Sequence, residues 1–241
     1  MAASHPLGVL LLHGYTSSLD TVNGLLPTLD ARGLPYRMPT LRGHGTHQRD
    51  LRGVTWRDWV ADASAALDDL RREAGRVAVV GLSMGGLVAA NLGIDRAADV
   101  AGVALVAPAV GFANRLAPLS GLIARVVPYA PAPRSVYDPA VQARMTNYPQ
   151  VEAGSFASLY QYSRLTLARA PALRRPLLVI ASRRDTVIPP RAIAAFLARV
   201  GTPAAQREVH WLQRSGHDIL MDMERETAFG LIGGWLDRLR P

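Results

Sequence analysis

The sequence contains the stretch Val77-Ala78-Val79-Val80-Gly81-Leu82-Ser83-Met84-Gly85-Gly86, followed by the apolar helical pattern of residues 87–92. A strand, the motif Gly-x-Ser-x-Gly and a helix, in that order, form a nucleophile elbow, which exposes a serine hydroxyl above the end of a sheet. Gly81 and Gly85 suit so tight a turn because they carry no Cβ. The alternative is a glycine-rich turn that holds an incidental serine. The rest of the sequence has to distinguish between these two interpretations.

Composition limits the classes of protein to which the chain can belong. Its 241 residues, 49% apolar and 19% charged, fit one large α/β domain with a well-buried core. The absence of cysteine excludes disulfides, thiolate catalysis and cysteine-bound zinc. The net charge of +8 comes from 27 basic residues, all arginine, which are scattered and form no basic stripe with interleaved aromatics. We therefore expect no nucleic-acid partner.

The N-terminal apolar run bears on location. Residues 9–12 are too few for the core of a signal peptide or for a membrane span, and no basic segment precedes them. We expect a cytoplasmic protein without stable membrane insertion. The sequence carries no signal for an oligomeric state.

Strand and helix patterns alternate along most of the chain, which predicts an α/β fold with a mostly parallel sheet and helices on both faces. The predicted strands are 8–12, 36–41, 77–80, 100–107, 176–181 and 207–212, and the predicted helices include 21–32, 55–74, 192–200 and 224–239.

The alternation stops between the fourth and fifth predicted strands, in a segment rich in proline and short apolar helices. We expect residues 1–110 and 174–241 to form the core and residues 111–173 to form a cap over the sheet edge. Apolar side chains of the cap and of the strand that follows are candidates to line an acyl pocket, or they simply hold the cap to the body. These candidates are Leu116, Leu119, Leu122, Ile123 and Val187, with Val126 nearby.

Three residues suited to nucleophilic catalysis each follow a predicted strand. Ser83, Asp185 and His217 occur in the order nucleophile, acid and histidine, so the carboxyl edge of one sheet can gather them. Asp218 and Asp222 are rival acids near the histidine. Asp185 is the better candidate because a side chain at i+1 points away from the imidazole that it must orient.

Two backbone N–H groups are candidates for an oxyanion hole. The loop His13-Gly14-Tyr15 follows the first predicted strand and offers the N–H of Tyr15, and Met84 offers the second N–H. A structural role is expected for His13. His44 and His47 have only Asp50 at a ligand-like spacing, so we expect no metal and no other cofactor.

These motifs together resemble the α/β-hydrolase superfamily and, within it, the small bacterial carboxylesterase and monoacylglycerol lipase group. The resemblance rests on residues 11–15 (LLHGY), 42–46 (RGHGT), 81–86 (GLSMGG), 185–189 (DTVIP) and 215–217 (SGH). It implies the α/β-hydrolase fold, with the cap inserted after the sixth-strand position of that fold. Tyr15 stands where phenylalanine is frequent in the family, which leaves the backbone donor unaffected.

The resemblance also implies an activity. We expect a serine hydrolase that forms an acyl-enzyme on Ser83 and cleaves short- to medium-chain acyl esters or monoacylglycerols. Thioesterase and other acyl-hydrolase activities keep the same three residues and stay open. A non-catalytic receptor for a small ligand on the same fold is the alternative from another class.

Overall fold

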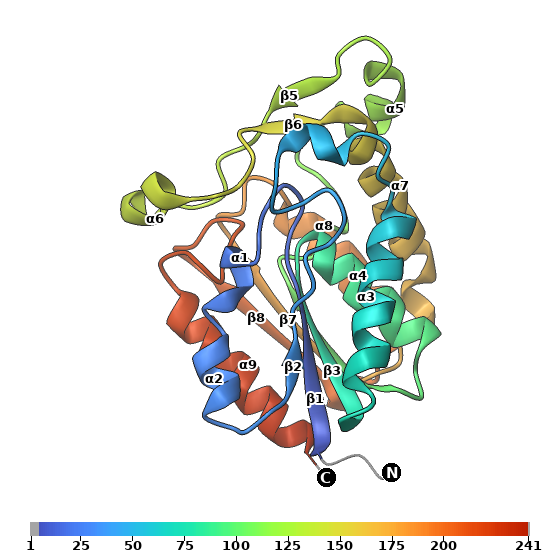
Figure 1. Cartoon of the computed structure of the whole chain (residues 1–241), viewed down its shortest axis with the longest axis vertical. Helices are drawn as coiled ribbons and strands as arrows, with labels where there is room; N and C mark the ends of the chain where they lie inside the picture. The colour runs from blue at the N-terminus through green and yellow to red at the C-terminus, as the bar shows by residue number, and fades with distance from the viewer. Residues whose placement is uncertain (1–4, 241) are drawn as a thin grey trace.

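A computed structural model describes residues 5–240 of the chain, built around one six-stranded sheet (Figure 1). The strand order is β2-β1-β3-β4-β7-β8, and every pairing between these strands is parallel. The predicted α/β fold is therefore confirmed. The strands are β1 (His5–Leu12), β2 (Tyr36–Arg37), β3 (Ala74–Leu82), β4 (Val100–Val106), β7 (Leu177–Ser182) and β8 (Arg207–Leu212).

The central strands are buried on both faces. In β1, Leu10 and Leu12 belong to one hydrophobic core, whereas Val9 and Leu11 belong to the other. Successive side chains of a strand point to opposite faces, so a continuous apolar run requires helices on both sides of the sheet. The edge strand β2 is shorter than the predicted 36–41 because Pro39 has no N–H for a strand ladder.

Helices cover the two faces of the sheet unequally (Figure 1). One core is built with α3 (Trp56–Leu70), α4 (Met84–Asp95), α7 (Ala153–Arg169) and α8 (Pro190–Leu197). The other is built with α1 (Asp20–Asn23), α2 (Leu26–Asp30) and α9 (Arg225–Leu239).

The predicted helix ends were right at some positions and wrong at others. Helix α3 begins after Thr55 as expected, and the Thr55 N–H donates to Asp58 Oδ2 over 2.8 Å. The single helix predicted for 21–32 is wrong, because the segment forms α1 and α2. Gly24, between them, lies so close to α9 that a Cβ there would stand 2.9 Å from the Phe229 ring.

Residues 111–173, which we propose as the cap, form short elements over the carboxyl edge of the sheet and then a long helix (Figure 1). Helix α7 packs on the core: Trp56 N–H donates to Ser158 Oγ, and Asn91 Nδ2 donates to Thr166 Oγ1. The shorter elements are η2 (Ala117–Leu119), α5 (Ser120–Ile123), α6 (Pro139–Arg144) and the hairpin of β5 (Tyr129–Pro131) and β6 (Gln150–Glu152).

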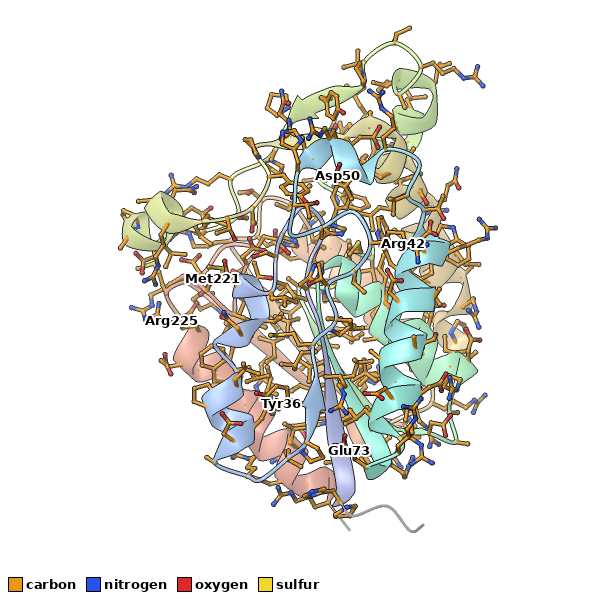
Figure 2. The ribbon with its side chains drawn as sticks, viewed as in Figure 1. Tyr36, Arg42, Asp50, Glu73, Met221 and Arg225 are labelled. Carbon is orange, nitrogen blue, oxygen red and sulfur yellow. The ribbon has the colours of Figure 1, made fainter. Side chains whose placement is uncertain are left out.

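The arginines are distributed over the surface. Arg42 and Arg225 lie on opposite sides of the molecule in Figure 2, and Arg42 pairs with Asp58 (2.7 Å) and Asp62 (3.1 Å). Arg96 likewise pairs with the carboxylate of Asp68. Within residues 5–240, no helix combines the length and the apolar character that crossing a bilayer requires.

The turn from β3 to α4 brings backbone segments into very close approach. A Cβ on Gly81 would lie 2.2 Å from the carbonyl oxygen of Gly85, and a Cβ on Gly85 would lie 2.4 Å from that of Leu12. Both obstacles are backbone atoms, which cannot rotate away. Only glycine therefore allows α4 to start directly against β3 and β1.

We predict that Gly81→Ala lowers the free energy of unfolding by more than about 4 kcal/mol, or prevents folding, because the clash is with backbone. The matched control is Gly230→Ala in the exposed middle of α9, where the new Cβ has no neighbour within 4 Å other than its own stretch of helix. It should stabilise the protein by about 0.5–1 kcal/mol. Urea unfolding measures both, and a Gly81→Ala protein as stable as wild type would contradict the close-packed turn.

Candidate active site

Ser83 occupies the turn between β3 and α4 in a conformation that is rare for a residue with a side chain. Its φ is 54° and its ψ is −109°. The neighbouring strand holds this geometry, since Ser83 N–H donates to Val106 O over 2.9 Å and Ser83 O accepts from Ala109 N over 3.1 Å. The predicted elbow is thus present, with the serine side chain at the carboxyl edge of the sheet.

The three residues predicted to act together lie within hydrogen-bonding distance. His217 Nε2 lies 2.8 Å from Ser83 Oγ, and His217 Nδ1 lies 2.8 Å from Asp185 Oδ2. All three are buried. Because a carboxylate accepts, Nδ1 carries the proton and Nε2 is free to accept from the serine hydroxyl. This is the arrangement that a general base requires.

Asp185 is fixed independently of the histidine. Its Oδ1 accepts from the backbone N–H groups of Val187 (2.8 Å) and Ile188 (2.9 Å), which leaves Oδ2 for the imidazole. Burial disfavours the imidazolium of His217. The charge and the hydrogen bond of Asp185, followed by the charge of Asp218, outweigh burial and raise the pKa of His217 above its ordinary 6.5.

The two rival acids have other partners. Asp222 accepts from the backbone N–H groups of Gly216 (2.6 Å), Tyr137 (2.8 Å) and Asp138 (2.8 Å), so it fastens the histidine loop to the cap. Asp218 Oδ2 accepts from Asn147 Nδ2 over 2.9 Å. Burial raises the pKa of Asp218, although interactions with His217, Ser135 and Asn147 oppose that rise.

The two proposed oxyanion donors lie at the same edge. Met84 is the first residue of α4, and Tyr15 lies in the loop after β1 and lines the pocket. Neither backbone N–H donates in the hydrogen bonds found within residues 5–240. The cap holds the Tyr15 side chain, whose hydroxyl donates to Glu152 O over 2.8 Å and lies 2.7 Å from Ser155 Oγ.

Two buried histidines support the Tyr15 loop. His13 Nε2 accepts from Leu41 N over 3.0 Å, so its Nδ1–H donates to Gly14 O. Burial, only partly opposed by the Gly14 bond, lowers the pKa of His13 to about 4. Burial and then the neighbouring His13 lower the pKa of His44 to about 3. Both rings are therefore neutral at pH 7, and their edge-to-face centroid distance is 4.9 Å.

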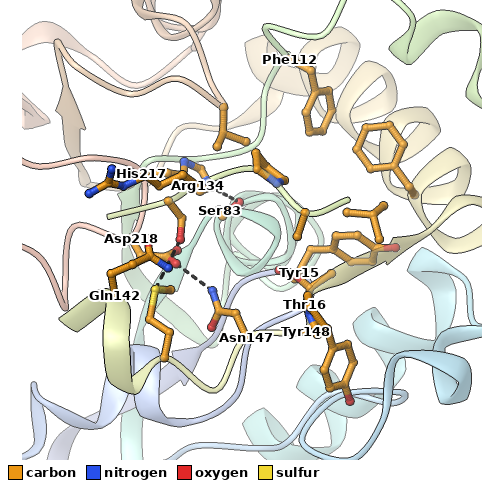
Figure 3. Close-up of a pocket in the computed structure, with 18 of the residues that line it drawn as sticks. Tyr15, Thr16, Ser83, Phe112, Arg134, Gln142, Asn147, Tyr148, His217 and Asp218 are labelled. Carbon is orange, nitrogen blue, oxygen red and sulfur yellow. Dashed lines mark hydrogen bonds between the residues drawn. The ribbon is translucent and has the colours of Figure 1, made fainter. Parts of the chain in front are cut away.

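A pocket of ≈ 680 Å³ opens over Ser83 and His217 (Figure 3). A second cavity of ≈ 330 Å³ adjoins it and shares Phe112, Phe156 and Val187 with it. Leu116, which is 56% exposed, and Ile123 line this second cavity. The other predicted pocket residues, Leu119 and Leu122, line neither cavity and are 51% and 62% exposed, and Val126 is also exposed.

A family model described as serine aminopeptidase, S33, matches residues 4–224. The chain belongs to this family. Among curated relatives, the thermostable monoacylglycerol lipase of Bacillus sp. (strain H-257) is 29% identical over 232 residues, which cover 93% of this chain and 88% of the relative. The carboxylesterase of Bacillus subtilis (strain 168) is 23% identical over 250 residues, covering 96% and 92%.

Solved structures agree on the fold. A structure reported for the metagenome-derived lipolytic enzymes LipS and LipT superposes with a TM-score of 0.90 at 23% identity, over 98% of this chain and 96% of that one. The predicted resemblance to the α/β-hydrolase superfamily, and to its carboxylesterase and monoacylglycerol lipase group, is confirmed.

Sequence reasoning missed part of the pocket of this S33 family member. Arg134, Gln142, Asn147 and Tyr148 all line it from the cap. None belongs to a motif, and none follows a strand of the main sheet. The only signal available was that the expected cap lies over the sheet edge and offers candidates to line a pocket.

We predict that the ring protons of His13 and His44 show no titration between pH 8 and pH 5, because burial holds both imidazoles neutral. In the urea-unfolded chain the same rings should titrate with a midpoint at about pH 6.5. Assigned NMR spectra recorded along a pH series measure this. A midpoint above pH 5.5 for either ring in the folded protein would contradict the structural role given to the pair.

Proposed function

We propose that this protein is a serine hydrolase that cleaves carboxylic esters, with short- to medium-chain acyl esters or monoacylglycerols as substrates. The observation that carries the proposal is the hydrogen-bonded series from Ser83 through His217 to Asp185 at the floor of a pocket with an apolar extension. The names of the relatives support the same substrate class. In this proposal residues 111–173 form the cap of a hydrolase body made by residues 1–110 and 174–241.

Acylation begins at the serine hydroxyl, which is a weak nucleophile until a base removes its proton. His217 Nε2 takes the proton while Ser83 Oγ attacks the ester carbonyl carbon. The negative charge moves to the carbonyl oxygen, and in this proposal the N–H groups of Tyr15 and Met84 donate to it. Preorganised donors of this kind contribute about 2.7–4 kcal/mol each to transition-state stabilisation.

The tetrahedral intermediate then collapses. The bond between the carbonyl carbon and the alcohol oxygen breaks, and His217 gives its proton to the departing oxygen. Water attacks the acyl-enzyme by the same route, with His217 again the base, and releases the acid and free Ser83. Asp185 keeps the imidazole oriented and stabilises the imidazolium without taking the proton.

Replacement of the nucleophile is the direct test. Ser83→Ala should lower kcat for p-nitrophenyl butyrate by at least about 10⁴-fold while the circular dichroism spectrum stays native, because no other group forms the acyl-enzyme. The matched control is Ser163→Ala, a buried serine of α7 outside the pocket, which should keep the wild-type rate.

The substrate bond is tested in parallel with aminoacyl p-nitroanilides, since the family takes its description from an aminopeptidase. We expect fast release of p-nitrophenol and little release of p-nitroaniline. Wild-type activity in Ser83→Ala, or cleavage of the anilides alone, would refute the proposal.

The pH dependence follows from the state of His217. The base must be neutral, so kcat/KM should fall as the pH drops through the His217 pKa, which Asp185 holds above 6.5 despite burial. The midpoint of the acidic limb should therefore lie above pH 6.5. Asp185→Asn should lower both the rate and this midpoint, because it removes the charge that stabilises the imidazolium. A wild-type midpoint below 6.5 would contradict this electrostatic assignment.

A further inference from the structure

The pocket above Ser83 has an apolar side and a polar side. In Figure 3, Phe112 and Tyr15 lie on one side of Ser83, and Asp218 and Gln142 lie on the other. The side of Phe112 continues into the second cavity, whose lining is mostly apolar. An acyl chain gains free energy when its apolar surface leaves water, so it fits that side. The alcohol half of the ester then extends toward the polar side.

The lining of this pocket contains one exposed charged side chain. Apart from His217, the lining residues that carry a formal charge at pH 7 are Arg134 and Asp218. Arg134 is exposed, whereas Asp218 is 4% exposed and its carboxylate accepts from Asn147 Nδ2. Burial also raises the pKa of Asp218, which disfavours its negative charge. Arg134 is therefore the charged lining residue that a substrate can reach.

The backbone around Arg134 is fastened to the loops that carry Asp185 and His217. Ser135 O accepts the N–H of His217 over 2.7 Å, and Arg134 O accepts from Thr186 Oγ1 over 3.4 Å. In the proposed mechanism His217 gives its proton to the departing alcohol oxygen, so the alcohol half lies near this histidine. A charged group on that half then occupies the part of the pocket that Arg134 lines.

The Arg134 side chain is oriented but has no counter-ion. Its Nε donates to Val136 O over 2.9 Å, and its guanidinium lies 5.7 Å from the centroid of the Tyr137 ring. The guanidinium of Arg184 lies 4.1 Å from the centroid of the same ring. Among residues 5–240, neither arginine has an ion-pair partner, and the two terminal nitrogens of Arg134 make no hydrogen bond. Two unpaired positive charges beside a pocket attract anions to it.

The acidic residues of the proposed cap do not neutralise Arg134. Residues 111–173 contain six arginines and two acidic residues, Asp138 and Glu152. Asp138 accepts from the first N–H groups of α6, and Glu152 accepts from Ser155 N near the start of α7. Neither carboxylate pairs with an arginine within the described part of the chain. The segment that supplies Arg134 is thus positively charged.

We propose that Arg134 binds an anionic group, a carboxylate or a phosphate, on the alcohol half of the ester, so that esters with a negatively charged leaving alcohol are the preferred substrates. A guanidinium offers paired N–H donors that match both anions. This inference rests on the proposed ester hydrolase function and adds to it a charged class of alcohol and the residue that recognises it.

The first test compares butyryl esters on the wild-type protein. 4-(Butyryloxy)butanoate is paired with the neutral 4-(butyryloxy)butanamide, and 3-(butyryloxy)propyl phosphate is paired with its neutral dimethyl ester. Each ratio of kcat/KM, anionic over neutral, is divided by the ratio of the hydroxide-catalysed rates at high salt, which removes differences in leaving-group reactivity. We expect a corrected ratio of at least about 5 for one or both anions, the effect of a partly exposed ion pair. Smaller ratios for both anions overturn the inference.

The second test identifies the residue. Arg134→Gln should bring the corrected ratio to within about twofold of 1, because the amide keeps polar atoms but loses the charge. The matched control is Arg125→Gln, which removes the same charge from an exposed arginine of the proposed cap that lines neither cavity, and it should leave the ratio unchanged. A folded Arg134→Gln variant that keeps the wild-type ratio, or an equal loss in Arg125→Gln, overturns the inference. If Arg134→Gln does not fold, the wild-type measurements decide.

Salt gives an independent measure on the wild-type protein. The preference for the anionic ester should fall between about 0.01 M and about 1 M NaCl, as the Debye length shortens from about 30 Å to about 3 Å. An undiminished preference overturns the inference. Hydrolysis of p-nitrophenyl butyrate and of the neutral esters with no preference for the anionic ones refutes the anion site alone. No hydrolysis of any of these esters refutes the proposed function and the anion site together.

Discussion

The architecture depends on one steric constraint, the contact between the backbones of β3, α4 and β1. The carbonyl oxygens of Gly85 and Leu12 occupy the space that a Cβ would need at Gly81 and Gly85. Helix α4 can therefore begin within one residue of the strand end, with Ser83 forced to a positive φ between them. The same contact brings the loop after β1, which carries Tyr15, against the turn that holds Ser83.

Parallel strand pairing brings the other two residues of the site to the same edge of the sheet. Since β7 and β8 run parallel to β3, their carboxyl ends open at the same edge, and the loops after them deliver Asp185 and His217. Each side chain is then fixed by its own backbone contacts. Val187 and Ile188 hold the carboxylate, and Ser135 O accepts the N–H of His217 over 2.7 Å. A residue of the proposed cap thus helps to position His217, the proposed base.

Much of this arrangement could be predicted from the sequence because its signals are local. The motif around Ser83 lies in the strand–turn–helix context that its chemistry requires, and Asp185 and His217 each follow an apolar run. Their proximity follows from the parallel topology, which brings residues that follow strands to one edge of the sheet. The choice of Asp185 over Asp218 also followed from a local rule, the direction of a side chain at i+1.

The pocket-lining residues of the expected cap could not be predicted in the same way. Leu119 and Leu122 carry the same apolar signal as Leu116 and Ile123, and Leu116 is also exposed, so only the path of the chain after β4 determines which of them line a cavity. Asn147 gave no signal, since its partner Asp218 is 71 residues away in the sequence. The predicted helix 21–32 failed for a related reason, because contact with α9 decides where the chain bends.

The central claim, that His217 activates Ser83, is tested most directly by covalent labelling with a fluorophosphonate probe followed by peptide mass spectrometry. The account predicts one adduct, on Ser83, and a labelling rate at least about 100-fold lower in a folded His217→Ala variant, the least that a lost general base should cost. Labelling at another residue, or an unchanged labelling rate in His217→Ala, would contradict it.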